Sequence, residues 1–391
     1  MSARAIANIL PALASGGATD ETTSHLTKAA SCQMSGYSHS TWRANNTRQV
    51  AGYRWASFMC AVAITLGWAS TSFASDEKFV LISHAADSDT WWNTVRNAIR
   101  QAGEDFNVTV DYRNPAKGEQ TGMAHLIDRA AASNYDGMIA TIGDFAVQKS
   151  LEQVVAKKIP LITINSGTQQ QSEQLGAIMH VGQPEYEAGK GAGVRAKASG
   201  IKSFVCVNTF AQSPISFERC RGFAEAIGVA DYRASILVAG TDASAVDSKL
   251  SAWLRAHPDT QAVLALGPDG SSAALKVLEK MGLKDKIWFA TFDLSDDAAK
   301  AIKEGSMKFA IDQQPYLQGY IPVAVMTIMK REKITDLETV MRILRDNPKF
   351  QKRLEEYGLT PLYGARHISS GPGFVTRGNI AKVEKYAGKY R

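Results

Sequence analysis

The chain has 391 residues and a formal net charge of +6. Its Lys and Arg residues form no run or stripe, so the basic balance gives no sign of a nucleic-acid partner. After residue 74, no apolar stretch approaches the roughly 20 residues that a membrane-spanning helix needs, which argues against an integral membrane protein.

Residues 48–74 carry the first clear pattern. Arg48 and Arg54 supply positive charge, an apolar run of about fifteen residues follows, and small residues end at Ala74. This order is typical of a secretory signal peptide, so we expect cleavage after Ala74 and export to the periplasm. Because the run is shorter than a membrane span, an uncleaved anchor is the less favoured alternative. Residues 1–47 lack apolar periodicity, and we interpret them as a disordered or untranslated leader.

The rest of the chain alternates short apolar runs, typical of buried parallel strands, with segments of helical spacing. In a first array, strands are predicted at 78–83, 108–112, 137–142 and 160–164, and helices at 91–103, 119–133 and 146–157. The rhythm restarts after a strand at 178–181, and the second array has strands at 203–207, 235–239, 262–266, 287–291 and 309–312 and helices at 185–199, 215–227, 244–255, 271–281 and 295–303. A helix at 319–329 has no place in the second array and is expected to pack on the first. This alternation predicts an α/β protein with two doubly wound parallel-sheet lobes.

Two cysteines, Cys206 and Cys220, lie beyond the predicted signal. Cys206 falls in a predicted apolar strand and Cys220 in the helix that follows it. In an oxidising compartment they could pair. The apolar surroundings favour two buried thiols instead, with a disulfide as the alternative.

Polar and aromatic residues follow many of the predicted strands. Because ligands of open parallel sheets bind outside the carboxyl ends of the strands, a cleft between the two lobes is the expected site. The candidates in chain order are His84, Asp89, Trp91, Trp92, Asp144, Asn165, Asp269, Asp293 and Gln313.

Two of these positions require a choice between roles. Trp91 and Trp92 at a helix start do not both fit a core stripe, so we expect one to be buried and the other to face a sugar ring; packing of both is the alternative. An Asp after a strand is often only a helix cap, and for Asp269 the two roles are equally plausible. For Asp293 we favour a ligand role, because Ser295 is better placed as the cap.

Several patterns of catalysis are missing from the sequence. It has no Walker-type loop, and the glycine-rich residues 189–193 lie inside a helical pattern, which favours close helix packing. It also has no Gly-x-Ser-x-Gly elbow, and its histidines lack metal-type spacing. Because nothing assembles a nucleophile with a base, we expect no enzyme, no metal ion and no cofactor.

An ordered set of stretches resembles the type I periplasmic sugar-binding proteins, the ribose- and galactose-binding receptors of ABC importers. The stretches are FVLISHAADSDTWW, GMIATIGD, IPLITINSG, ERCRGFAEAI, FATFDLSDD and IDQQPYLQGY. The resemblance runs from about Lys78 to Asn379. It implies two α/β lobes joined by three crossing strands, with a ligand held between the lobes.

The resemblance also assigns site residues. Trp91 and Trp92 match the family's aromatic pair, with Asp89 beside them, and the family's Phe-Asp pair and hinge glutamine fall at Asp293 and Gln313.

Three family positions differ in this chain. Where the family has an Asp-Arg pair, this chain has Asn165 and Ser166. Where the family has a second arginine, this chain has Phe217, and where it has an asparagine, this chain has Pro268. Because those arginines normally make charge-assisted hydrogen bonds, their loss implies a neutral polyol or unusual sugar, with His84, Asn165 and Gln313 as donors.

The function implied by the resemblance is a monomeric periplasmic receptor that captures a neutral sugar or polyol and delivers it to an ABC permease. A periplasmic sensor that presents its ligand to a chemoreceptor or sensor kinase is the alternative, and the same cleft would serve it. A lac-repressor-like regulator would need a helix-turn-helix of roughly 50–60 residues ahead of the core, where this chain has the predicted signal.

The resemblance also sets the expected boundaries. The N-terminal lobe is predicted to comprise 75–181 plus 315–345, and the C-terminal lobe 182–314 plus 346–391. The three crossings are expected near 181–183, 313–315 and 373–377. Between the last two lies a highly charged segment, 331–370, which we interpret as a solvated helix with loops.

Overall fold

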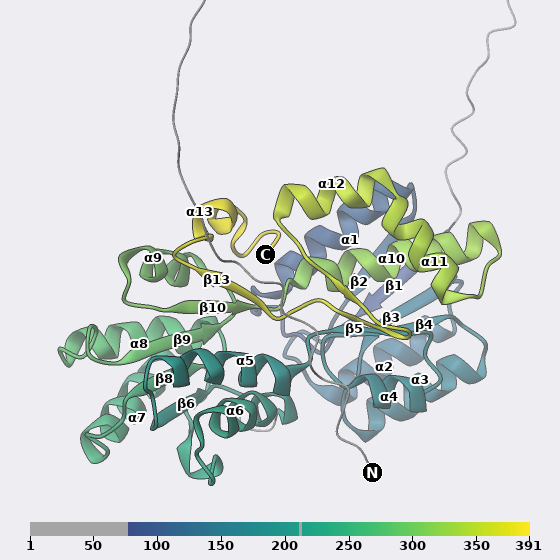
Figure 1. Ribbon diagram of the computed structural model, residues 1–391. Helices are drawn as coiled ribbons and strands as arrows, with labels where there is room; N and C mark the ends of the chain where they lie inside the picture. The colour runs from purple at the N-terminus through teal and green to yellow at the C-terminus, as the bar shows by residue number, and fades with distance from the viewer. Residues whose placement is uncertain (1–76, 211–212) are drawn as a thin grey trace, which may run out of the picture. The chain divides into compact units, whose positions relative to one another are not determined.

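The computed structural model of the protein describes residues 77–210 and 213–391 (Figure 1). The predicted leader and signal peptide lie outside the described residues. Within those ranges, no helix has both the length and the apolar character to cross a membrane.

The first lobe is built on a seven-stranded sheet with the order β11-β12-β5-β4-β3-β1-β2. Its parallel strands are β1 (Lys78–Ile82), β2 (Thr109–Arg113), β3 (Gly137–Thr141), β4 (Leu161–Ile164), β5 (His180–Gly182) and β12 (His367–Ser369). Strand β11 (Leu362–Tyr363) runs antiparallel to β12 at the edge. The central strands β3 and β4 are buried along their whole length, as expected for strands covered on both faces.

Helices cover both faces of this sheet (Figure 1). On one face lie α1 (Trp92–Phe106), α10 (Pro315–Glu332), α11 (Leu337–Asp346) and α12 (Pro348–Tyr357); on the other lie α2 (Gln120–Ala131), α3 (Phe145–Ala156) and α4 (Gln169–Gln174). Helix α10 is buried on all sides from Pro315 to Thr327, which is typical of a helix inside a core. It approaches α1 closely, because a Cβ atom on Gly319 would lie 2.8 Å from the Val95 carbonyl oxygen. The predicted return of this helix to the first array is confirmed.

The second lobe has a six-stranded sheet with the order β13-β10-β9-β8-β6-β7. Its parallel strands are β6 (Phe204–Asn208), β7 (Ile236–Val238), β8 (Ala262–Ala265), β9 (Trp288–Phe292) and β10 (Phe309–Asp312), and β13 (Gly373–Thr376) is antiparallel to β10. Helices α5 (Glu185–Ala198) and α6 (Pro214–Ile227) pack on one face; α7 (Ala243–Ala256), α8 (Pro268–Lys280), α9 (Asp296–Glu304) and α13 (Ile380–Val383) pack on the other. Two doubly wound α/β lobes, as predicted, are confirmed.

Helices α5 and α6 touch backbone to backbone. A Cβ atom on Gly189 would lie 2.1 Å from the Arg219 carbonyl oxygen, and one on Gly222 would lie 2.1 Å from the Tyr186 carbonyl oxygen. Only glycine fits at such distances. The glycine-rich residues 189–193 therefore serve close helix packing, as predicted.

The C-terminal part of the predicted lobe boundaries is wrong. Residues 346–369 were expected in the second lobe, but α12 packs on the first lobe, and β12 pairs with β5. The charged segment 331–370 is accordingly not a solvated helix with loops. Among its charges, Leu344, Phe350 and Tyr357 are buried against the first core, since apolar groups recur on one face of each helix.

The third crossing also differs from the prediction. Residues 373–376 form β13 of the second sheet, so the chain crosses at 370–372 instead. The three crossings meet at Gly371, where a Cβ atom would lie 2.5 Å from Gln183 Oε1, 2.9 Å from the Asp312 carbonyl oxygen and 3.1 Å from Gln313 Cα. Gln183 follows β5, and Gln313 follows β10. One glycine thus touches all the segments that join the two lobes.

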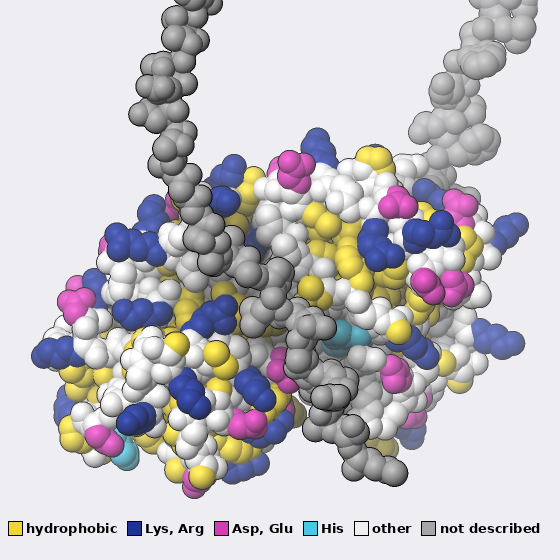
Figure 2. All heavy atoms as spheres, in the orientation of Figure 1, with side chains coloured by type: hydrophobic (Ala, Val, Ile, Leu, Met, Phe, Trp, Pro, Cys, Tyr) yellow, Lys and Arg dark blue, Asp and Glu magenta, His cyan; other side chains and the backbone are white. Residues whose placement is uncertain are grey.

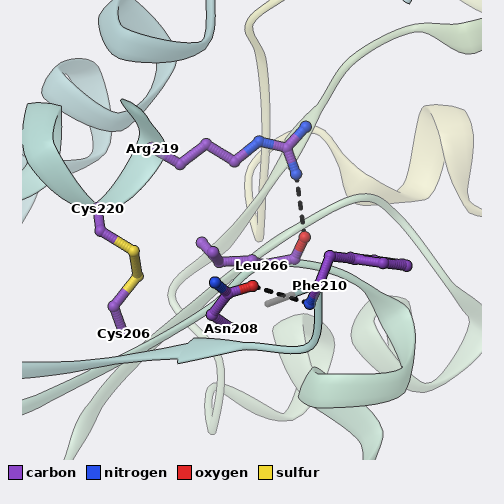
Figure 3. Close-up of a disulfide and its surroundings, with 6 residues drawn as sticks. All are labelled: Cys206, Asn208, Phe210, Arg219, Cys220 and Leu266. Carbon is purple, nitrogen blue, oxygen red and sulfur yellow. Dashed lines mark hydrogen bonds between the residues drawn. A yellow bond between two sulfur atoms is a disulfide. The ribbon is translucent and has the colours of Figure 1, made fainter. Parts of the chain in front are cut away.

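Cys206 and Cys220 form a disulfide, with a Cα–Cα distance of 6.0 Å (Figure 3). The preference for two buried thiols is therefore wrong. Both residues are fully buried, and they face one another between β6 and α6 in the same core. The bond ties α6 covalently to the strand beneath it.

We predict that Gly371→Ala lowers the free energy of unfolding by about 1–3 kcal/mol, the usual cost of overpacking a tight site. The new methyl group would collide with the backbone of the second crossing, which has little room to move. Urea denaturation measures the change. Gly378→Ala is the control, because its Cβ atom would meet only Thr376 Oγ1, at 3.7 Å. Equal losses in the two variants would show that the crossings are not in close contact.

Candidate functional site

Asp293 lies at the centre of the polar residues that follow the strands. It comes directly after β9 in the left-handed region, with φ of 67°, and its backbone N–H donates to the Ile311 carbonyl oxygen at 2.8 Å. Helix α9 is capped by Ser295, whose hydroxyl accepts from the Ala298 N–H at 3.2 Å, as predicted. The Asp293 carboxylate is therefore not needed as a cap.

The carboxylate of Asp293 joins the two lobes. Its Oδ1 accepts a hydrogen bond from the Trp91 indole at 3.0 Å and another from the Gln313 amide at 2.7 Å. Trp91 belongs to the first lobe, and Gln313 to the second crossing. The structure thus brings together three of the predicted site residues.

Burial raises the pKa of Asp293 to about 6. The nearby positive charge of Arg219 and the hydrogen bonds from Trp91 and Gln313 lower this pKa, whereas Glu185 adds a small rise. At neutral pH the side chain is therefore an ionised carboxylate held almost out of water, with 7% of its surface exposed. Such a group accepts charge-assisted hydrogen bonds strongly.

The two tryptophans differ in burial, as predicted, whereas contact of Trp91 with a ligand stays a prediction. Trp92 is buried in the core of the first lobe, and Trp91 is partly exposed. Their rings meet edge to face, with centroids 5.1 Å apart. Trp92 thereby orients Trp91, whose N–H points at Asp293.

His84 follows β1 and lies behind Trp92. Its Nδ1 is 3.1 Å from Thr141 Oγ1, and its ring meets the edge of Trp92 at 5.5 Å. Burial lowers the pKa of His84 to about 4, so the imidazole is neutral at physiological pH. A neutral imidazole can donate or accept a hydrogen bond.

Two more predicted carboxylates lie near one another. Asp89 accepts a hydrogen bond from the Trp91 backbone N–H at 3.1 Å. Burial raises the pKa of Asp89, the bond from Trp91 lowers it, and the charge of Asp269 raises it again. Asp269 is exposed in the first turn of α8, which has Gly267 at its N-cap and no side-chain cap, so the capping role considered for Asp269 is not observed.

The remaining predicted residues are not drawn into this group by any contact among the described residues. Asp144 is exposed and caps α3 by accepting from the Val147 N–H at 3.1 Å. The ring of Phe217 lies 5.5 Å from the Arg233 guanidinium, so it packs beside another part of the second lobe. Asn165 has a φ of 57° and is held by a backbone bond to the Val181 carbonyl oxygen at 3.1 Å. Its side chain makes no hydrogen bond within the described part of the chain.

Sequence reasoning missed Arg219, a buried cation whose charge acts on Asp293. Its Nε and Nη2 donate to the Glu185 carboxylate at 2.7 and 2.8 Å. Its Nη1 donates to the Leu266 carbonyl oxygen at 3.0 Å, as Figure 3 shows. Its guanidinium lies over the Phe292 ring at 4.2 Å. Arg219 lies in the stretch ERCRGF, which contributes to the family resemblance, but the resemblance assigned no site role to this residue.

The end of β6 adds two polar groups, Asn208 and Thr209. Asn208 is fully buried, and its Oδ1 accepts from the Phe210 N–H at 2.8 Å (Figure 3). Asn208 Nδ2 and Thr209 Oγ1 are buried without a hydrogen-bond partner among the described residues. Since buried polar atoms are nearly always paired, these two atoms are candidates for contact with a ligand or water.

The assembled groups are suited to holding hydroxyl groups. They offer a carboxylate, a neutral imidazole, amides and an indole, which together donate and accept hydrogen bonds and present an aromatic face. In the described ranges, no group of three or more His, Cys, Asp or Glu residues has the arrangement of a metal site. The chemistry supported is recognition of a small polar molecule.

Comparison with known proteins places this arrangement in a family. Residues 79–333 match the family described as a periplasmic binding protein domain. The ribose import binding protein of Salmonella typhimurium is 25% identical over 302 residues, which cover 73% of this chain and 98% of that protein. The xylose/arabinose-binding protein of Sulfolobus acidocaldarius is 22% identical over 260 residues, which cover 63% of this chain and 64% of that protein.

Solved structures agree with the sequence match. A carbohydrate transporter from Acidothermus cellulolyticus, in complex with myo-inositol, superposes with a TM-score of 0.67 and is 28% identical; the match covers 81% of this chain and 100% of that chain. A solute-binding protein from Burkholderia graminis, in complex with D-arabinose, has a TM-score of 0.60 at 19% identity and covers 78% and 97% of the two chains, which shows the shared fold. By its matched residues, its two-lobed fold and these likenesses, the chain belongs to the periplasmic binding protein domain family.

Proposed function

We propose that this protein is the receptor of an ABC importer, and that it binds a neutral sugar or polyol between its two lobes and delivers it to the permease. The observation that carries the proposal is the Asp293 carboxylate, hydrogen-bonded to Trp91 of the first lobe and to Gln313 of the second crossing. Hydroxyl groups of a ligand placed there would be held by both lobes at once.

The charges around Asp293 favour a neutral ligand. Asp89, Asp269 and Asp293 concentrate negative charge at this end of the strands, which repels an anion. Arg219, the cation that acts on Asp293, is already bonded to Glu185 on two nitrogens. The myo-inositol in the structure from Acidothermus cellulolyticus supports a polyol.

The remaining parts of the proposal concern the setting of the protein. We propose that residues 48–74 direct export to the periplasm, where the mature chain acts as a monomer without a nucleic-acid partner. On the face drawn in Figure 2, Lys and Arg side chains of the described residues are interspersed with acidic and neutral ones, which supports the last point. The family of periplasmic binding proteins supports the compartment.

A ligand screen tests the proposed class. We expect neutral compounds such as myo-inositol, ribose and arabinose to include one that raises the melting temperature, because a ligand at 100 times its Kd adds about 2.7 kcal/mol of stability. Gluconate and ribose 5-phosphate should have no effect. Calorimetry then measures the affinity. A sugar phosphate as the tightest ligand would refute the proposal.

Asp293→Asn is expected to lower the affinity for the ligand found in that screen by about tenfold or more, since losing one charge-assisted hydrogen bond costs about 1.5–3 kcal/mol. The same variant should be more stable than the wild type at pH 7.5. The pKa of Asp293 is raised in the folded state, from 3.8 to about 6, so its contribution to stability is greatest below pH 4 and falls as the pH rises through 6. Removing the buried charge removes this loss.

Thermal unfolding from pH 4 to pH 8 checks the second part, and the gap between variant and wild type should close near pH 4. Asp296→Asn is the matched control, because Asp296 is exposed in the first turn of α9 only three residues away. If Asp293→Asn bound as tightly as the wild type, the carboxylate would not be the ligand's partner.

The signal prediction has a direct test. Mass spectrometry of the exported protein should find Ser75 as its first residue, because the small residues ending at Ala74 fit signal peptidase. A full-length chain in the membrane fraction would contradict it.

A further inference from the structure

We propose that Arg219 and Glu185 form a positioning pair for Asp293: Arg219 holds the Phe292–Asp293 turn in place, and Glu185 holds Arg219. The inference rests on the ligand-binding role proposed for Asp293. Neither member of the pair is expected to touch the ligand.

The first support is geometric. The Arg219 guanidinium has three partners. Its Nε and Nη2 donate to Glu185, its Nη1 donates to the Leu266 carbonyl oxygen, and its plane lies over the Phe292 ring. Leu266 directly follows β8. Strand β8 pairs with β9, and Asp293 directly follows β9. One buried side chain therefore holds two neighbouring strand ends together.

The second support is that Arg219 itself cannot shift easily. Figure 3 shows Arg219 reaching from α6 toward the Leu266 carbonyl, with the Cys206–Cys220 bond on the same helix. That bond fixes the next residue of α6 to β6, and the backbone contacts of Gly189 and Gly222 fix α6 against α5. Glu185 begins α5 and so meets Arg219 in a set register.

The third support is a link to the crossings between the lobes. Gln183 follows β5, and its amide donates to Glu185 Oε2 at 2.8 Å. Its Oε1 faces Gly371, the glycine at which the crossings meet. Gln313 of the second crossing donates to Asp293 directly. The Asp293 carboxylate is thus connected to the first crossing through Arg219, Glu185 and Gln183. It is connected to the second crossing directly, through Gln313.

The charged groups near Asp293 come from several elements. Arg219 on α6 and Glu185 on α5 act on it with opposite signs. Asp312 at the end of β10 is paired with Arg391 at 2.7 Å. Asp269 on α8 and Asp89 before α1 interact with each other, and the partners from the first lobe and the second crossing, Trp91 and Gln313, are uncharged.

This arrangement fixes the sign of two substitutions. Loss of the positive charge in Arg219→Gln must raise the pKa of Asp293, and loss of the negative charge in Glu185→Gln must lower it. If the pair only braced α5 against α6, both substitutions would weaken the fold, and they would not shift the pKa of Asp293 in opposite directions. Opposite shifts therefore separate the two explanations.

The experiment is a titration of the Asp293 carboxyl carbon by NMR in the oxidised protein without ligand. We expect a midpoint near 6 in the wild type, a rise of about one pH unit in Arg219→Gln and a fall in Glu185→Gln. Arg221→Gln is the control, because Arg221 lies on the same helix but pairs with Glu218 near the surface, and its midpoint should equal that of the wild type. Shifts in the same direction, or no shift in either variant, would overturn the proposal.

Two further variants keep the test decisive if a single substitution prevents folding, since a buried charge without its partner is strongly destabilising. Arg219→Lys keeps the charge but loses the fork, so its midpoint should stay near the wild-type value. Arg219→Met with Glu185→Met removes both charges, and its midpoint should rise, because Arg219 affects Asp293 more than Glu185 does. A midpoint unchanged in the double variant would contradict the electrostatic role.

Binding of myo-inositol, followed by calorimetry from pH 5 to pH 8, then links the titration to function. Affinity should fall as Asp293 gains a proton, so the pH of half-maximal affinity should follow the NMR midpoint in each variant. If the midpoints shift as expected but no neutral polyhydroxyl compound binds, the positioning pair stands and the proposed ligand class fails.

Discussion

The structure depends on holding one ionisable carboxylate, that of Asp293, almost out of water at the ends of two sheets. Burying a charge is costly unless it receives hydrogen bonds and a compensating charge. Asp293 receives bonds from Trp91 and Gln313, and Arg219 supplies the charge. These three partners come from different parts of the chain. The start of α1, the second crossing and α6 are therefore all constrained by the needs of the same side chain.

The scaffold meets these constraints with rigid elements. Each lobe has its own core on both faces of a parallel sheet, and the polar residues follow the strands, where the backbone leaves the sheet. Asn165 and Asp293 both turn with positive φ at this point. Such backbone conformations persist where the surroundings hold them, and they are frequent at binding sites. Recognition groups on short, fixed turns lose little entropy when they bind.

Much of this could be predicted from sequence, for local reasons. Buried strands appear in the sequence as apolar runs, and two adjacent tryptophans at a helix start do not both fit a core stripe, so the two lobes and the burial of one tryptophan were predictable. Arg219 was not, because its partner Glu185 lies 34 residues away and the charge sits inside an ordinary helix. The disulfide likewise depends on how α6 lies on β6. The packing of residues 346–369 on the first lobe could not be predicted, because the segment is mostly charged and only a few apolar side chains, such as Phe350, pack on that lobe.

The Cys206–Cys220 bond also makes the finished fold depend on the compartment, because a disulfide forms in an oxidising environment. A chain that folds in a reducing cytoplasm would lack the covalent tie between α6 and β6 at Cys220, the residue next to Arg219. If the protein is exported, the last constraint on the recognition surface is added only after translocation, by oxidation. Material made in the cytosol for ligand screening could then pass every test of folding and still present a looser surface to the ligand.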